Sequence, residues 1–569
     1  MLTHQISRVG ALATSATLLH HVHTCRASQC CTAPTQAIPG SSLKTNVQSK
    51  VGKSGARLRV ASSRTKLKRE DIEEKSIAEL SADMSSGCVT SEELVEAYIF
   101  AIEELDRSGP TLRSVIRLNP NALSDARSLD MDRARGSIRG ALHGIPILVK
   151  DNVETADPMP TTAGSLALIA NETGRDAPVV ASLRAAGAVI LGKTNLSEWS
   201  NIRSSRSSSG WSAVGGLTRN PFALDRTAVG SSSGSGAAVA ANLAAAALGT
   251  ETDGSITCPA AAAGLVGLKP TVGLVARRHI IPISNSQDTP GPMTRTVEDA
   301  ACLLTIMAGI DPDDPATWDA DLHKSNYADA LRPEALSGAR IGVARFLSHG
   351  WDKVLQKEYD HALERMRSMG AELVEITELP TVDEIKSNEL CVLLCEFKSG
   401  LNAYLAHAAP AVKARSLADI IAFNEREAER ELAYFGQDLL LQSEATQGLD
   451  TEGYKVALEK NQRLAGPEGI DYLLRRHGLD ALVSPTMRPA WTIDLVNGDH
   501  HCESAAFLPA VAGYPHLTVP MGQVFGLPVG ISFIGAAWSE QRLLSLGYAF
   551  EKGTGARKRP AFTVCSPEL

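Results

Sequence analysis

The first 69 residues of this 569-residue chain contain no aspartate or glutamate, and Glu70 is the first acid. The same segment holds eleven Lys and Arg residues and is rich in Ser and Thr. Such a composition is typical of an organelle transit peptide, so we predict that residues 1–69 are a disordered leader, removed on import into a chloroplast or a mitochondrion. A secretory signal fits less well, because the apolar stretch Val9–Leu19 runs into three histidines. A disordered basic tail, with a cytoplasmic location, is the alternative.

Basic residues are scarce beyond the leader. Residues 70–569 carry 45 Lys and Arg against 64 Asp and Glu, a formal charge of −19, so we expect no nucleic-acid partner. Long apolar runs are also missing. The longest uncharged segment, Val229–Thr250, is rich in Ser, Gly and Ala and contains Asn242, so we expect no membrane span. The partner that we expect is a small-molecule or peptide substrate. Whether the chain forms a homodimer is left open.

Cysteines are scattered rather than clustered. Of the ten, Cys25, Cys30 and Cys31 lie in the leader. Cys391 and Cys395 are four residues apart, but no Cys-x-x-Cys pair or His–Cys cluster has the spacing of metal ligands. We therefore expect reduced thiols that pack as small apolar side chains, with no structural disulfide, no metal and no cofactor.

Strand-like and helix-like segments alternate along the rest of the chain. Apolar runs without polar alternation predict buried strands, at 144–150, 188–191, 339–346, 372–376, 481–484, 516–519 and 529–533. Other segments predict helices, at 76–107, 179–186, 236–247 and 416–442. This order predicts an α/β layered fold around a buried sheet. We assign residues 70–553 to one domain, 315–470 within it to a mostly helical insertion that shapes the substrate entrance, and 554–569 to a C-terminal tail.

Two glycine-serine turns stand 24 residues apart, one around Ser231 and one around Ser255. Between them, the Ala-rich stretch Gly236–Ala247 predicts a helix and Leu248–Glu251 a returning strand. A helix of ten or eleven residues rises about 16 Å, and a strand of about five residues covers a similar length. The two turns are therefore expected to meet, and the glycines permit N–H groups before Ser255 to converge on one oxygen atom.

Lys150 ends the apolar run Gly144–Lys150. Burial disfavours the charged form of a lysine and lowers its pKa, which would let Lys150 act as a base. A lysine that leaves its strand for solvent is the alternative. With two serines on special turns, this residue completes a set that supplies a nucleophile, a relay and a base without a histidine.

Three other motif interpretations apply to the first turn. A phosphate-binding loop requires Gly-Lys-Ser/Thr, and no lysine follows Gly234 or Gly236. A dinucleotide fingerprint lacks its third small residue and its preceding strand. A nucleophile elbow, Gly230-x-Ser232-x-Gly234, matches formally and would make Ser232 the nucleophile, but the polar stretch before it is a poor strand.

At these residues the chain strongly resembles the amidase signature family. The resemblance is carried by Gly230-Ser-Ser-Ser-Gly-Ser-Gly-Ala-Ala-Val-Ala-Ala, by Gly249-Thr-Glu-Thr-Asp-Gly-Ser-Ile, by Gly267-Leu-Lys-Pro-Thr-Val-Gly273 and by Lys150-Asp-Asn. It extends from about Ile77 to about Glu551. The family fold that it implies is a single large α/β domain, with a central mixed β-sheet covered by helices on both faces.

The resemblance also implies a role for each site residue. Ser255 would be the nucleophile, Ser231 the bridging serine after a cis peptide bond, and Lys150 the base. Ser232 would be a supporting hydrogen-bonding residue, and the backbone N–H groups of Thr252, Asp253, Gly254 and Ser255 would form the oxyanion hole. Attack on a carboxamide would then give an acyl-enzyme, which water hydrolyses.

The residues next to Ser255 narrow the class of substrates that we expect. Many relatives have an arginine where this chain has Thr257, and in the amidase-like subunit of glutamyl-tRNA(Gln) amidotransferase that arginine suits an acidic acyl group. Glu251-Thr-Asp-Gly-Ser-Ile instead resembles the peptide-amidase branch, which deamidates C-terminal peptide amides and related compounds. We therefore expect an amidase acting on peptide or small amides. An organellar glutamyl-tRNA(Gln) amidotransferase subunit is the alternative, and a catalytically silent binding scaffold is a third hypothesis.

Overall fold

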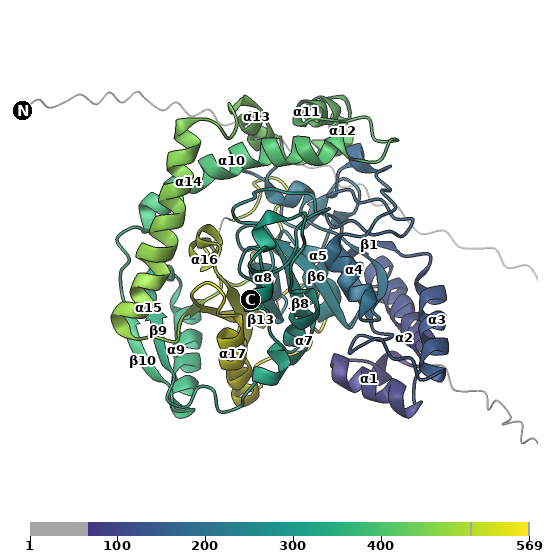
Figure 1. The fold of residues 1–569 in the computed structure, drawn as a ribbon, viewed down its shortest axis with the longest axis horizontal. Helices are drawn as coiled ribbons and strands as arrows, with labels where there is room; N and C mark the ends of the chain where they lie inside the picture. Colours follow the sequence, from purple (N-terminus) through teal and green to yellow (C-terminus); the bar gives the residue numbers. More distant parts are fainter. Residues whose placement is uncertain (1–66, 501–502, 567–569) are drawn as a thin grey trace, which may run out of the picture. The chain divides into compact units, whose positions relative to one another are not determined.

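The computed structural model describes residues 67–500 and 503–566 (Figure 1), so the predicted leader lies outside the described residues up to residue 66. An eleven-stranded sheet forms the centre of this part of the chain, and it contains both parallel and antiparallel pairs. In sheet order its strands are β1 (Val115–Leu118), β3 (Val189–Thr194), β2 (Pro146–Lys150), β6 (Ala246–Glu251), β8 (Thr289–Thr294), β7 (Val266–Lys269), β12 (His516–Val524), β13 (Leu527–Ile534), β11 (Ala481–Pro485), β9 (Arg340–Ala344) and β10 (Glu372–Ile376). A separate short hairpin pairs β4 (Trp211–Ser212) with β5 (Gly216–Leu217).

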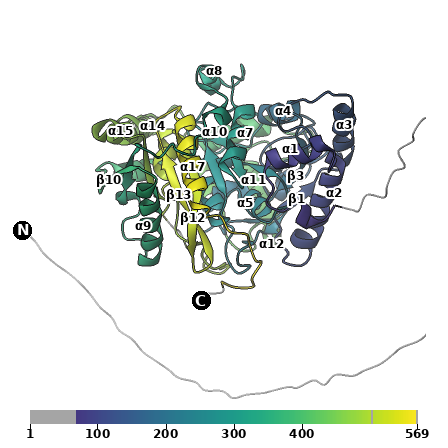
Figure 2. The same ribbon diagram turned by 90° about the horizontal axis from the view of Figure 1, so that it is seen from below.

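Helices cover both faces of the sheet (Figures 1 and 2). One group contacts the sheet and its own neighbours: α2 (Ser91–Ala101), α3 (Ala122–Ala134), α7 (Val297–Met307), α9 (Lys353–Ser368) and α17 (Glu540–Thr554), joined by α1 (Ile77–Ser86) and α4 (Pro178–Ala185). The opposite group is centred on α5 (Ser233–Ala240) and α6 (Thr257–Ala262). The predicted fold, a large α/β domain with a central mixed sheet between helices, is confirmed.

The three parallel strands β3, β2 and β6 place the site. They lie side by side in the sheet, and every residue in them is buried. Because parallel strands end at the same edge, the carboxyl end of β2 brings Lys150 next to Thr250 and Glu251 at the end of β6. This edge is where ligands bind in open α/β sheets.

The predicted Ala-rich helix is too long. Helix α5 ends at Ala240, and Ala246 and Ala247 already belong to β6. The chain reverses at Asn242, which has a positive φ of 57° and whose side-chain oxygen accepts a 2.8 Å hydrogen bond from the backbone N–H of Glu74. Pairing with β2 and β8 therefore overrides the helix preference of alanine.

The helix predicted over 76–107 is interrupted. Ser76 caps α1 in a reciprocal box with Glu79, and α1 stops at Gly87, which has a φ of 75°. Thr90 then caps α2, which continues as a π-helical segment from Ile102 to Arg107.

The segment predicted as long helices over 416–442 is three short ones: α11 (Leu417–Arg426), α12 (Ala428–Glu431) and α13 (Asp438–Ala445). Two acids explain the breaks. Glu431 forms a buried ion pair with Arg203, and Asp438 accepts hydrogen bonds from Ser204 and Ser205. The helix is therefore interrupted where these two acids make their contacts.

Residues 315–470 contain both helices and strands. Strands β9 and β10 complete one edge of the sheet. The long helix α10 (Val382–Ala406) lies along the top of Figure 1 and contacts α11, α13 and α14 (Glu452–Ala465). The remaining helices are α8 (Ala320–His323), α15 (Asp471–His477) and α16 (Phe507–Ala512). In the described part of the chain no helix is both long and apolar enough to cross a membrane.

The two ends of the described domain contact each other. Arg557, just after α17, makes two hydrogen bonds to Glu74, at 2.9 and 2.8 Å, and donates a third to the carbonyl of Gly264 at 2.6 Å. Arg69 also lies over the ring of Phe562, 5.7 Å from its centroid. The segment predicted as a tail is thus packed onto the domain, as far as residue 566.

Candidate active site

Lys150 is fully buried at the end of β2. Its Nζ lies 2.8 Å from Ser231 Oγ, 3.0 Å from Thr250 Oγ1 and 3.2 Å from the carbonyl oxygen of Thr250. The alternative in which this lysine reaches solvent is therefore wrong.

The surroundings of Lys150 lower its pKa. Burial is the main cause and brings the pKa to about 7, against the opposing effect of the Asp288 and Glu251 carboxyls. The pKa of Asp288 is itself raised to about 6 by burial. At neutral pH a substantial fraction of Lys150 is thus uncharged, as a proton acceptor must be.

Ser231 follows a cis peptide bond from Gly230 and is fully buried. Its carbonyl accepts a 3.1 Å hydrogen bond from the N–H of Ser197. A Cβ on Gly230 would lie 2.2 Å from Ser197 Oγ, so a larger residue there would force the Ser197 side chain to move. The side chain of Ser231 faces Lys150, as the proposed relay requires.

Ser255 lies in the turn after β6, where Gly254 has a φ of 74°. The backbone N–H of Ser232 donates a 3.1 Å hydrogen bond to the carbonyl of Ser255, so the two glycine-serine turns meet as predicted. Within the described residues, however, no hydrogen bond links the hydroxyls of Ser231 and Ser255. The structure joins Lys150 to Ser231 and brings Ser255 alongside.

Ser232 does not have the exposed hydroxyl of a nucleophile elbow. It is fully buried, and its Oγ donates to the carbonyl of Thr250 at 3.1 Å and accepts from the N–H of Thr250 at 3.2 Å. Both hydrogen-bonding capacities fix the start of α5 to the end of β6. This places Ser232 in a supporting position.

Glu251 braces the turn from inside, a role that sequence reasoning missed. Its Oε2 accepts hydrogen bonds from the N–H of Ile256 at 2.7 Å, the N–H of Thr257 at 2.8 Å and the hydroxyl of Thr257 at 3.1 Å. Thr257, which replaces the arginine of many relatives, is thus buried and points at Glu251. An acid directly after the long uncharged segment Val229–Thr250 is the sequence signal that could have indicated this role.

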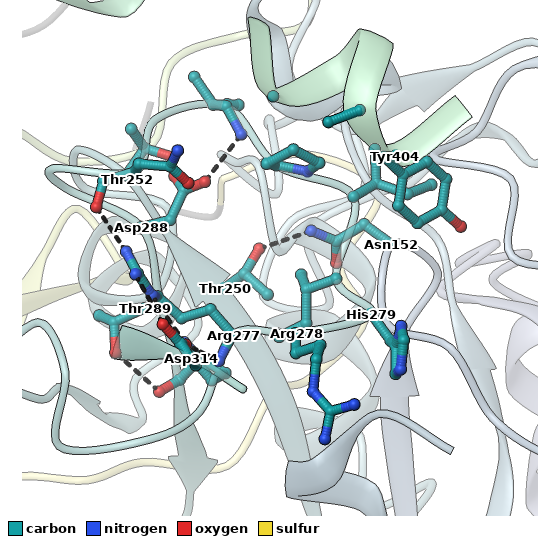
Figure 3. A pocket seen from close by; sticks show the side chains of 18 of the residues that line it. Asn152, Thr250, Thr252, Arg277, Arg278, His279, Asp288, Thr289, Asp314 and Tyr404 are labelled. Atoms are coloured by element: carbon teal, nitrogen blue, oxygen red, sulfur yellow. Dashed lines mark hydrogen bonds and ion pairs between the residues drawn. The ribbon is translucent and has the colours of Figure 1, made fainter. Parts of the chain in front are cut away.

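Asn152 and Thr250 support the lysine. The amide of Asn152 donates to Thr250 Oγ1 at 2.9 Å (Figure 3). The same oxygen contacts Lys150 Nζ. The sequence marks Asn152 only as part of a motif and Thr250 not at all, because their contact joins positions 98 residues apart.

The N–H groups proposed for the oxyanion hole belong to Thr252, Asp253, Gly254 and Ser255. In the described ranges none of these four groups donates a hydrogen bond to another protein atom. The side chain of Thr252 is held in place, since its hydroxyl donates to Asp288 at 2.5 Å. The turn thus leaves these four donors free for a substrate oxygen.

Two cavities approach this turn. The smaller, of about 310 Å³, we call the Trp491 cavity; it is lined by Asn201, Ser204, Ser205, Ser207, Ser209, Val229, Gly230, Asp253, Gly254, Cys258, Leu439, Met487, Trp491, Asp499 and Ser504. The larger, of about 600 Å³, we call the Tyr404 cavity (Figure 3). It borders Asn152, Thr250 and Thr252. None of the three proposed catalytic residues lines either cavity, but Gly230 and Gly254, which directly precede the two serines, line the Trp491 cavity.

The described residues hold no group of three His, Cys, Asp or Glu side chains placed to bind a metal ion. Their cysteines, at 88, 258, 302, 391, 395 and 565, are free thiols.

Comparison with known proteins gives consistent matches. The family model described as Amidase matches residues 93–544. A probable amidase of Arabidopsis thaliana is 40% identical over 501 residues, which cover 86% of this chain and 92% of that protein. A glutamyl-tRNA(Gln) amidotransferase subunit of Halorhodospira halophila is 34% identical, over 86% of this chain and 99% of that one.

Solved structures give a closer match. The peptide amidase of Stenotrophomonas maltophilia is 51% identical with a TM-score of 0.82, and the match covers 86% of this chain and 99% of that structure. The same scores apply to a peptide amidase in complex with the competitive inhibitor chymostatin.

Proposed function

Since this chain belongs to the amidase family and is an amide-hydrolysing enzyme, we propose that it releases ammonia from C-terminal peptide amides or small amides. The reaction would use Ser255 as nucleophile, Ser231 as relay and Lys150 as base. The observation that carries this proposal is the 2.8 Å contact between Ser231 Oγ and a buried lysine with a pKa of about 7.

The proposed cycle combines proton transfer through Ser231 with a covalent acyl-enzyme on Ser255. Neutral Lys150 accepts the proton of Ser231, Ser231 accepts that of Ser255, and Ser255 Oγ attacks the carboxamide carbon. The free N–H groups of residues 252–255 would stabilise the negative oxygen. The C–N bond then breaks, ammonia leaves with the proton that Lys150 returns, and water hydrolyses the acyl-enzyme by the same path.

The Trp491 cavity supports an uncharged acyl group. Its described lining includes the apolar side chains of Leu439, Met487 and Trp491 but no lysine or arginine. A glutamyl carboxylate would find no cationic partner there and would lie near Asp253. Transamidation of a glutamyl group therefore stays the alternative, and peptide amides are favoured.

The nucleophile assignment can be tested by substitution. Ser255→Ala should abolish ammonia release and labelling by a fluorophosphonate, while circular dichroism shows an intact fold. Ser232→Ala is the matched control, and it should retain labelling because its hydroxyl only links α5 to β6. Loss of labelling in Ser232→Ala but not in Ser255→Ala would overturn the assignment.

The same preparation separates the two candidate functions. An isolated chain that hydrolyses simple peptide amides without partner subunits supports the amidase. A chain that is inactive alone, and active on glutamyl-tRNA only with co-purifying subunits, supports the alternative.

A further inference from the structure

Asp253 stands between two donors of the proposed oxyanion hole and two residues before Ser255. It also lines the Trp491 cavity, beside Gly254. A side chain in this place can reach the part of the substrate next to the reacting carbonyl, and the proposed mechanism gives it no task.

The carboxyl of Asp253 has an unused acceptor. Its Oδ1 is buried and accepts no hydrogen bond from any described residue. The side-chain amide of Gln287 donates to the carbonyl of the adjacent Thr252 at 3.3 Å and to Glu389 at 3.0 Å. A buried acceptor without a donor is unfavourable, so the site gains when a ligand supplies one.

The second acid of the cavity differs in this respect. Asp499 accepts hydrogen bonds from the N–H of Ser209 at 2.8 Å and from Trp491 Nε1 at 3.2 Å. These contacts join two walls of the cavity, which is a structural task. Of the two acids, Asp253 is therefore the one with an oxygen that no protein donor occupies.

The electrostatic setting favours a neutral donor. Burial raises the pKa of Asp253 well above its usual range, and the neighbouring carboxyls of Glu389 and Glu251 raise it further. A carboxyl group accepts a hydrogen bond through its carbonyl oxygen in either protonation state. A peptide N–H carries no charge, so it can donate to this carboxyl group whether the group is protonated or ionised.

We infer that Asp253 is a specificity-determining residue, whose carboxyl accepts the peptide N–H of the residue that carries the scissile carboxamide. That nitrogen is two bonds from the carbon that Ser255 attacks, and Asp253 is two residues from Ser255 along the turn. This inference rests on the proposed function. It narrows the substrate class to amides of N-acylated α-amino acids and peptides, and it disfavours aryl-acetamides and fatty amides, which lack an α-nitrogen.

The test compares two substrates that differ in one atom. N-acetyl-L-leucinamide has the N–H, and its isostere with an ester oxygen in place of that nitrogen does not. Ammonia release gives kcat/KM for both. The wild-type enzyme should prefer the amide by about ten- to a hundredfold, because the ester oxygen leaves the carboxyl unpaired.

Substitution of the residue locates the preference. Asp253→Ala should bring the ratio of the two kcat/KM values close to one, whereas Asp253→Asn, which keeps an acceptor oxygen, should retain part of it. Asp360→Ala is the control, since Asp360 is an exposed acid paired with Arg345, outside both cavities. It should leave the ratio unchanged.

Two outcomes would overturn the inference. One is a wild-type ratio near one, which needs no variant and is independent of folding. The other is an Asp253→Ala enzyme that loses activity on both substrates equally, which would mean that the residue only shapes the turn. If the wild-type enzyme releases ammonia from neither substrate nor from any other amide, the proposed function fails instead.

Discussion

The amino group of Lys150 meets three oxygen atoms, and two of them belong to Thr250. Three acceptors suit an ammonium group, which would favour the charged form, but burial acts in the opposite direction and is larger. Because the pKa that results is about 7, one side chain can accept and return a proton in the neutral range.

A pH profile tests this balance. The base must be uncharged, so kcat/KM should rise with pH and level off above an apparent pKa of about 7. Below that value it should fall about tenfold per pH unit. Measurement on a peptide amide between about pH 5 and pH 9 would show the limb, and a flat profile across this range would contradict the assignment.

A neighbouring charge supplies the control for that profile. Asp288 raises the pKa of Lys150, and Asp288→Asn removes this effect. The limb should then move to lower pH. A shift to higher pH would mean that another group titrates.

Lys150, Ser231 and Ser255 could be selected from the sequence because each lies in a short local pattern, an apolar run or a glycine-serine turn. Glu251, Thr250 and Asn152 could not. Their roles depend on contacts across strands, such as the one between Asn152 and Thr250, and single residues of common types carry no local mark of such contacts. The roles of the serines rest on the family resemblance and not on geometry that the sequence could supply.

At the scale of elements, α5 and β6 hold the two turns together. The small side chains of α5 let it pack against β1, β2, β3, β6 and β8. The sequence predicted both elements but not their boundary, because the reversal at Asn242 depends on Glu74, 168 residues away. The strands were predicted more reliably, since buried runs such as Pro146–Lys150 are continuous.

A glycine substitution measures how close this packing is. A Cβ on Gly234 would lie 2.3 Å from the carbonyl oxygen of Ser114 and 2.6 Å from the backbone N of Asn195. Backbone atoms cannot rotate away, so Gly234→Ala should destabilise the fold by about 1–3 kcal/mol or more. Thermal unfolding would detect it.

Gly436→Ala is the matched control, because a Cβ there meets no atom within 4 Å. It should unfold at the wild-type temperature or slightly above. Equal unfolding temperatures for both variants would show that α5 can shift without cost.

For the molecule as a whole, a buried ion cluster joins the helical layer to the loops of the site. Arg203 is fully buried between Glu198 and Glu431, 2.5 Å from the former, and lies over the ring of Phe435 at 3.8 Å. It thus ties α12 to the loop that carries Ser197. Burial raises the pKa of both glutamates, and the charge of Arg203 opposes this rise.

Removal of this arginine should loosen the whole domain. Arg203→Met leaves two buried carboxyls without their cation and should cost about 3–5 kcal/mol, measured as a lower urea midpoint. Arg367→Met provides the control, because Arg367 pairs with Glu364 at the surface and should contribute at most about 1 kcal/mol. Equal midpoints for the two variants would show that Arg203 is not required to join the layers.

The contact of Arg557 with Glu74 bears on how the chain could be rearranged. Residues near the two ends of the described domain lie side by side, so the order of segments along the chain is not fixed by the architecture. A short linker from residue 566 to residue 67 would close the polypeptide into a ring. The ring could then be opened at an exposed position that lines neither cavity, such as Gly350, to give a circular permutant with Lys150, Ser231 and Ser255 in place.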